Sequence, residues 1–164
     1  FDRDGQRAAQ GVVNEELLGQ LLRHPYLTRQ PPKSTGREEF GVPFFNELIA
    51  GAAYGEHELL ATLTEFSVRA IASAIRSFAQ PTADLAEVWV AGGGVHNQQM
   101  MKRLRAALAD MRVESLAGLG VDPDAREALS FAVLANETLM GGAGNMPSAT
   151  GAERAVILGK VALP

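Results

Sequence analysis

The sequence predicts an α/β fold with a large helical share, and three observations support this. Apolar residues recur every three or four positions in several segments, of which residues 56–78 are the longest. Two short segments rich in β-formers, 87–91 and 113–117, each precede a helical pattern. The resulting order of strand, helix, strand and helix is typical of an α/β core.

The first third of the chain is expected to be mostly helical with irregular connections. Residues 1–13 carry a turn signal and two valines, which favour a short strand or hairpin. Asn14 is a good N-cap for a helix over 15–23, whose leucines share one face. Residues 25–41 are expected to be an irregular polar stretch, followed by a short helix over 43–50.

The middle and end of the chain alternate between the two periodicities. The helix over 56–78 ends at a Gln-Pro pair, and the strand over 87–91 runs into three consecutive glycines. A helix follows over 98–111, with Met101, Leu104, Leu108 and Met111 directed inward. After the strand over 113–117, Asp122 and Pro123 open a helix that ends near Met140, where two glycines follow. The apolar run at 155–163 predicts a last strand.

Composition excludes several functional classes. The 164 residues include no cysteine, which excludes disulfides and thiolate metal sites. A net charge of −4 and a pI near 5.4 argue against nucleic-acid binding. We expect no membrane span, because no apolar run reaches about 20 residues, and no signal peptide. The expected location is the cytoplasm, and the start at Phe1 without methionine suggests part of a longer protein.

The glycine-rich segment 91–97 is the first candidate for a binding site. Gly92, Gly93 and Gly94 lie between a predicted strand and a predicted helix. Without side chains, the backbone there can turn sharply, and its N–H groups can approach a phosphate or nucleoside. A tight turn without any ligand explains the same pattern equally well.

The carboxylates that open the helix at 122–140 are the second candidate. Helix capping is a sufficient explanation for Asp122 and Asp124. Glu127 lies further into the helix, ahead of small residues that permit close packing, where a carboxylate can reach sugar hydroxyls.

Two loops complete the set of candidates. Residues 31–41 contain Lys33 and Arg37 beside hydroxyl side chains, so this loop can bind an anion or can be a solvated linker. Residues 144–152 are interpreted as a structural turn that returns the chain to its last strand. The three histidines show no spacing that is typical of metal ligands, so no metal site is expected.

Five segments together resemble the anhydro-N-acetylmuramic acid kinase family, enzymes of peptidoglycan recycling. They are Pro-Pro-Lys-Ser-Thr-Gly-Arg-Glu at 31–38, Ala-Thr-Leu-Thr at 61–64, Gly-Gly-Gly-Val-His-Asn at 92–97, Asp-Ala-Arg-Glu-Ala at 124–128 with Phe-Ala at 131–132, and Pro-Ser-Ala-Thr-Gly-Ala at 147–152. No single segment is decisive, but the ordered set is specific and extends over essentially the whole chain.

The resemblance implies an actin-like (ribonuclease H-like) ATPase fold, with two α/β lobes around a nucleotide cleft. Residues 1–164 would be the C-terminal lobe, helix-rich with a short mixed sheet, and the N-terminal lobe would be absent from this chain. The family's glycine turn implies that Gly92, Gly93, Gly94 and Asn97 hold ATP.

The resemblance also implies an activity. The family hydrolyses the 1,6-anhydro ring of anhydro-N-acetylmuramic acid and phosphorylates O6, using ATP and Mg²⁺. Its catalytic aspartate lies in an Asp-Thr-Gly-Pro-Gly-Asn segment and its phosphate loop reads Asp-Gly-Thr-Ser; neither occurs here, so both are expected upstream of Phe1 and the chain alone would be inactive. Glu127 would hold the sugar, Lys33 and Arg37 would meet its lactyl carboxylate or stabilise lobe closure, and a homodimer would suit the family.

Two other interpretations remain open from the sequence. The first is a nucleotide-binding regulatory or chaperone-like module of the same fold, which would bind ATP without dependence on a sugar. The second is a non-enzymatic assembly fragment whose helix over 56–78 packs on a partner chain.

Overall fold

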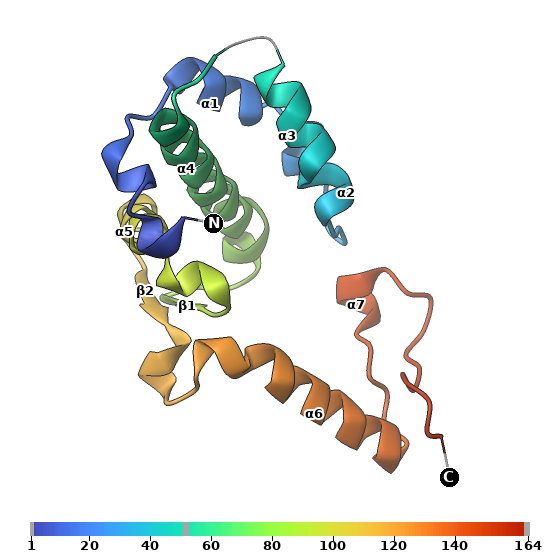
Figure 1. The fold of residues 1–164 in the computed structure, drawn as a ribbon. Coiled ribbons are helices and arrows are strands. Elements are labelled where there is room, and N and C mark those ends of the chain that lie inside the picture. The colour runs from blue at the N-terminus through green and yellow to red at the C-terminus, as the bar shows by residue number, and fades with distance from the viewer. Residues whose placement is uncertain (1, 51–52, 163–164) are drawn as a thin grey trace.

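The computed structural model describes residues 2–50 and 53–162. Its helices and strands are α1 (Glu15–Leu21), α2 (Arg37–Phe40), α3 (Val42–Ile49), α4 (Glu56–Ala74), β1 (Glu87–Val90), α5 (Gln98–Ala107), β2 (Arg112–Ser115), α6 (Arg126–Met140) and α7 (Pro147–Thr150). Helices α1 to α5 and the two strands form one body, and α6 extends away from it (Figure 1). The segment after α6 turns back, so that Gly151 lies beside Pro32. The helix-rich α/β class predicted from the sequence is therefore confirmed.

Helix α4 is the centre of the body because it contributes to both hydrophobic clusters. On one side Phe66 packs with Leu17, Leu18 and Leu21 of α1. The other cluster joins α4 to α5 and the sheet; its buried members are Val68, Ala72, Met101, Leu104, Leu108, Met111 and Val113. In α1 and α5 the apolar stripe that predicts the helix is the surface that packs. In α4 the buried face differs in part from the predicted stripe, because Ile71 of that stripe is 39% exposed whereas Val68 and Ala72 are buried.

Asn14 caps α1 as predicted and also fixes α1 to α4. Its Oδ1 accepts a hydrogen bond from the Leu17 amide at 2.9 Å, and its Nδ2 donates to Glu58 Oε1 at 2.8 Å. Its own amide donates to Oγ1 of the fully buried Thr62 at 2.9 Å. One residue therefore satisfies the start of one helix and anchors it to another.

Strands β1 and β2 pair in parallel, with Val88 opposite Val113 and Trp89 opposite Glu114. Because the strands are parallel, their carboxyl ends lie at the same edge of the sheet, and α5 forms the crossover between them. The sheet of the described residues is parallel, so the prediction of a mixed sheet is wrong.

The short strand or hairpin predicted over residues 1–13 is not formed by the described residues 2–13. Residues 3–5 and 8–10 form two 3₁₀ turns, because the Asp2 carboxylate accepts hydrogen bonds from the amides of Arg7 and Ala8, both at 2.9 Å. These local bonds organise the segment without a partner strand.

The stretch over 25–41 is more ordered than predicted. It contains a 3₁₀ turn over Pro25–Thr28 and the short helix α2. Phe40 of α2 packs against the rings of His24, Phe44 and Phe66, with centroid separations of 4.7, 5.3 and 6.0 Å. This aromatic cluster offsets the weak helical tendency of the polar sequence around it.

The predicted last strand is wrong for the residues that are described, 155–162, which form neither strand nor helix; residues 163–164 lie outside the described part. The segment is held by local hydrogen bonds instead: the Val156 amide donates to Asn145 Oδ1 at 2.7 Å, and the Gly144 amide donates to the Val156 carbonyl at 3.0 Å. An apolar run becomes a strand only beside a partner strand, and none lies beside this one in the described structure.

Glu65 links α4 to α5 and gives the body an expected pH dependence. Burial would raise the pKa of Glu65, but hydrogen bonds from Arg69 (2.8 Å) and Arg103 (2.9 Å) outweigh it and lower that pKa below 4.5. A lowered carboxyl pKa stabilises the fold above the unfolded value and loses this effect as pH falls below it. The free energy of unfolding should therefore decrease as pH is lowered through 4.5.

The variant Glu65→Gln tests this expectation by urea unfolding at pH 7 and at several values below 4.5. The substitution should lower stability at pH 7 and flatten the acid dependence, because glutamine cannot titrate. Glu16→Gln, at an exposed position of α1, should keep the dependence of the parent chain. An unchanged acid profile in Glu65→Gln would show that this carboxylate does not contribute.

Across residues 2–50 and 53–162, no helix is both long enough and apolar enough to cross a lipid bilayer.

Candidate functional site

The glycine turn follows β1 at the carboxyl edge of the sheet. Gly92 has φ +80°, a left-handed conformation that favours glycine, and residues 93–96 form a 3₁₀ turn that leads into α5. The Gly92 amide donates to the Pro123 carbonyl at 2.9 Å. The turn is therefore attached to the segment that opens α6.

The surface of this turn is open. A Cβ built on Gly92 or Gly93 meets no atom within 4 Å, and Gly93 and Gly94 are exposed. The amides of Gly93 and Gly94 begin a 3₁₀ turn, in which the first N–H groups have no acceptor within the helix. The turn therefore exposes backbone N–H groups that can donate to a ligand lying against it.

Asn97 has a structural role at the end of the same turn. Its Oδ1 accepts a hydrogen bond from the Met100 amide at 3.0 Å and so caps α5. The Nδ2 group is the part of this side chain that can serve a ligand.

The start of α6 lies beside the glycine turn. Asp122 Oδ1 accepts from the Asp124 amide at 2.9 Å, so Asp122 caps the 3₁₀ turn Pro123–Ala125 that precedes α6. Helix α6 itself begins at Arg126 without a side-chain cap, so the predicted helix start at Asp122 is four residues too early. Asp124 contacts His96 of the glycine turn, with its two carboxylate oxygens 3.0 and 2.8 Å from His96 Nε2. This pair is not predictable from the sequence, because it links residues 28 positions apart and fits no spacing pattern.

Glu127 is the second residue of α6 and lies three residues after Asp124. Its side chain is 81% exposed, and its nearest charged partner is Arg126, with Nη2 3.8 Å from Glu127 Oε1. Because Asp124 and Pro123 attach the start of α6 to the glycine turn, Glu127 and Gly92–Gly94 belong to one region of the structure. A carboxylate so exposed is available to a polar ligand.

Lys33 and Arg37 lie elsewhere. The Lys33 ammonium donates to the carbonyls of Tyr26 and Leu27, both at 3.2 Å, and lies over the rings of Tyr26 and Phe78. Arg37 is the exposed first residue of α2. In the described part of the chain, no hydrogen bond or ion pair connects either cation with the glycine turn.

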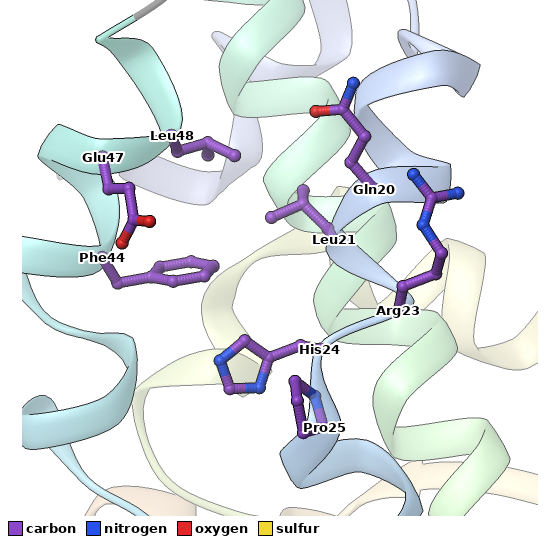
Figure 2. Close-up of a pocket in the computed structure, with 8 residues that line it drawn as sticks. All are labelled: Gln20, Leu21, Arg23, His24, Pro25, Phe44, Glu47 and Leu48. Atoms are coloured by element: carbon purple, nitrogen blue, oxygen red, sulfur yellow. The ribbon is translucent and has the colours of Figure 1, made fainter.

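A separate pocket of about 460 Å³ lies between α1 and α3 (Figure 2). Figure 2 shows Leu21, His24 and Phe44 directed toward one another, with Arg23 and Glu47 on opposite sides. The His24 ring packs against Phe40 and Phe44, which explains its position as part of an aromatic cluster. No residue predicted to bind ligand lines this pocket.

The described residues contain no group of three His, Cys, Asp or Glu side chains arranged for a metal ion.

Comparison with known proteins agrees with the resemblance seen in the sequence. The profile of the anhydro-N-acetylmuramic acid kinase family matches residues 1–164. Proteins named anhydro-N-acetylmuramic acid kinase are 44% identical over 163 residues in Thiobacillus denitrificans, 37% over 166 in Caldanaerobacter subterraneus and 38% over 167 in Bacillus cereus. These matches cover 98%, 99% and 100% of this chain but 43%, 42% and 44% of the three relatives, so the chain spans less than half of their length. This chain belongs to the anhydro-N-acetylmuramic acid kinase family.

Proposed function

We propose that this chain is the C-terminal lobe of an ATP-dependent kinase that acts on anhydro-N-acetylmuramic acid. In the proposed reaction a base removes a proton from water, and the water oxygen bonds to C1 as the C1–O6 bond breaks. O6 then bonds to the γ-phosphorus of ATP, and ADP leaves. The products are N-acetylmuramic acid 6-phosphate and ADP, as cell-wall recycling requires.

The observation that carries the proposal is the junction of the glycine turn with the start of α6. Ligands of open α/β sheets bind beyond the carboxyl ends of the strands, which is where this junction lies. The open backbone at Gly92 and Gly93 fits a nucleotide that rests on it, and the Asn97 Nδ2 group is near enough in sequence to add a donor. The actin-like ATPase fold is proposed with this function.

Glu127 is proposed to accept hydrogen bonds from the sugar hydroxyls, since its carboxylate is exposed and follows within a few residues the segment attached to the glycine turn. Of the two cations, Arg37 fits the lactyl carboxylate better, because the donors of Lys33 are engaged by two backbone carbonyls. Lys33 is then proposed to support the loop and lobe closure.

The catalytic base and the β,γ-phosphate clamp are proposed to come from a part of the kinase outside these 164 residues. Mg²⁺ would be held mainly by the ATP phosphates and by that part, as is usual for kinases. The chain alone would therefore not transfer phosphate. The cytoplasm is the proposed location, because ATP is supplied there, and a homodimer is the proposed assembly.

The test is ATP-dependent phosphorylation of anhydro-N-acetylmuramic acid by a complete kinase polypeptide that contains this chain. The variant Glu127→Gln keeps the size of the side chain and removes its charge. It should lower kcat/KM for the sugar at least about tenfold, because a charged acceptor contributes about 1.5–3 kcal/mol to a hydrogen bond.

Asp84→Asn is the matched control, because Asp84 is also exposed but lies in the loop before β1. Its kcat/KM should equal that of the parent. If Glu127→Gln behaved like Asp84→Asn, Glu127 would be removed from the sugar site. Titration calorimetry separates the regulatory alternative, which requires ATP binding that is unaffected by the sugar.

A further inference from the structure

Helix α6 is the less buried of the two longest helices in the described structure, α4 and α6. It has 15 residues and none of them is buried. The exposed fractions of its largest apolar side chains are Leu129 53%, Phe131 71%, Val133 53%, Leu139 73% and Met140 78%. Large apolar side chains that are exposed together mark a surface that another polypeptide covers.

These side chains are distributed around the helix and are not confined to one side. At 100° per residue, Leu129, Val133 and Met140 fall on one side. Phe131 falls on the opposite side, and Leu139 falls between the two, about 80° from both Leu129 and Phe131. A helix that is apolar all round is typical of the interior of a larger protein. Between Ala128 and Met140 the sequence has a single charged residue, Glu137.

The C-terminal segment covers the Phe131 side incompletely. Thr138 Oγ1 donates to the Leu158 carbonyl and ties this segment to α6. An apolar pocket of about 480 Å³ remains between them, lined by Phe131, Leu134, Leu139, Leu158 and Val161 among others. Ile157 and Val161 are themselves 54% and 55% exposed. The exposed apolar surface therefore includes both α6 and this segment, which lie together in Figure 1.

The adjoining sheet is incomplete as well. Within the described chain, β1 and β2 pair with each other and leave their outer edges unpaired. Parallel sheets are normally larger than two strands and covered on both faces. Apolar surface on α6 and open strand edges thus occur on neighbouring elements, because β2 leads through two turns into α6.

We propose that the apolar surface of α6 binds the part of the family's polypeptide that does not align with this chain. More than half of each of the three kinases compared lies outside the matched segment, and a polypeptide of that length can cover the apolar surface of α6. A second copy of this chain is a poorer fit, since a twofold contact would cover one side of α6. The low charge of α6 indicates a permanent, hydrophobic interface. The inference needs family membership and not the proposed reaction.

The first test mixes this 164-residue chain with the polypeptide of the Thiobacillus denitrificans kinase that lies outside the matched segment. Sedimentation should show a one-to-one complex, and hydrogen exchange of the amides over 126–140 should slow at least about 100-fold on binding. Leu129→Glu and Phe131→Glu, on opposite sides of α6, should each raise the Kd at least about tenfold. Circular dichroism establishes that the variants retain the helical content of the parent.

Val12→Glu is the matched control, because Val12 is 80% exposed and lies before α1. This variant should bind like the parent. Unchanged exchange over 126–140 in a complex that forms elsewhere would overturn the proposal. So would self-association of this chain that protects α6 without the added polypeptide, which would identify a second copy as the cover.

A fusion protein avoids the need for the added kinase polypeptide to be soluble on its own. The same kinase polypeptide is fused ahead of Phe1, and exchange over 126–140 is measured in the single chain. Slow exchange that Leu129→Glu and Phe131→Glu accelerate supports the proposal, and rapid exchange in the folded fusion contradicts it. Either result stands whether or not the fusion has kinase activity.

Discussion

Replacing Leu108 with alanine is expected to lower the free energy of unfolding by about 3–5 kcal/mol. Leu108 is 0% exposed and packs in the cluster that joins α4, α5 and β2. The substitution removes the transfer free energy of the buried side chain and leaves a cavity that close-packed neighbours cannot fill fully. Because the cluster contains residues of α5, the helix into which the glycine turn leads, the loss should also affect the packing that holds this turn.

Urea unfolding of the 164-residue chain measures this effect. Leu119→Ala is the control, because Leu119 is 57% exposed and its truncation should change the free energy of unfolding by less than about 0.5 kcal/mol. A loss below about 1 kcal/mol for Leu108→Ala would mean that the cluster relaxes around the truncation. It would then not be the main core of this half of the body.

The helices of the body could be predicted because their evidence is local. The spacing that predicts a helix over 98–111 also assigned Met101, Leu104, Leu108 and Met111 to the interior, and all four are buried. Helix α5 nevertheless ends at Ala107, because Leu108 adopts φ −119° and ψ 45° as the chain turns toward β2. The apolar spacing continues past the end of the helix, so it does not show where the helix ends.

The errors concern segments whose structure depends on partners. The apolar run at 155–163 predicted a strand, but a strand is defined by hydrogen bonds to a neighbour and not by composition. The N-terminal turns depend on the Asp2 carboxylate, whose bonds to residues five and six positions later follow no common motif. Local pattern alone could not distinguish these outcomes.

The candidate site likewise combines a local feature, which the sequence predicts, with contacts between distant residues, which it does not predict. A strand, three glycines and a helix are contiguous, so the turn at 92–94 was readable from the sequence. Its attachment to α6 through His96 and Asp124 joins residues far apart in the chain, and only the family resemblance suggested that Glu127 belongs nearby. The roles that the resemblance implies for Lys33, binding the lactyl carboxylate or stabilising lobe closure, stay predictions, and the sequence does not indicate that its ammonium donates to two backbone carbonyls.

Replacing Gly93 with valine is expected to weaken ATP binding about 100-fold, which corresponds to about 2.7 kcal/mol. A Cβ at this position meets no protein atom within 4 Å, so the fold should accept the side chain. The same side chain would occupy the space proposed for the nucleotide. Gly92 is less suitable for this test, since its φ of +80° adds backbone strain of about 1–2 kcal/mol to any substitution.

Titration calorimetry with ATP, on a complete kinase polypeptide that contains this chain, gives the measurement. Gly19→Val is the matched control, because it introduces the same side chain in α1, where the nearest atom to a built Cβ is Arg23 Nη1 at 3.9 Å. The control should bind ATP like the parent, and both variants should keep their unfolding midpoints within a few degrees. If Gly93→Val folded and bound ATP normally, the nucleotide could not rest on this turn, and the proposed arrangement of ATP and sugar around the start of α6 would fail with it.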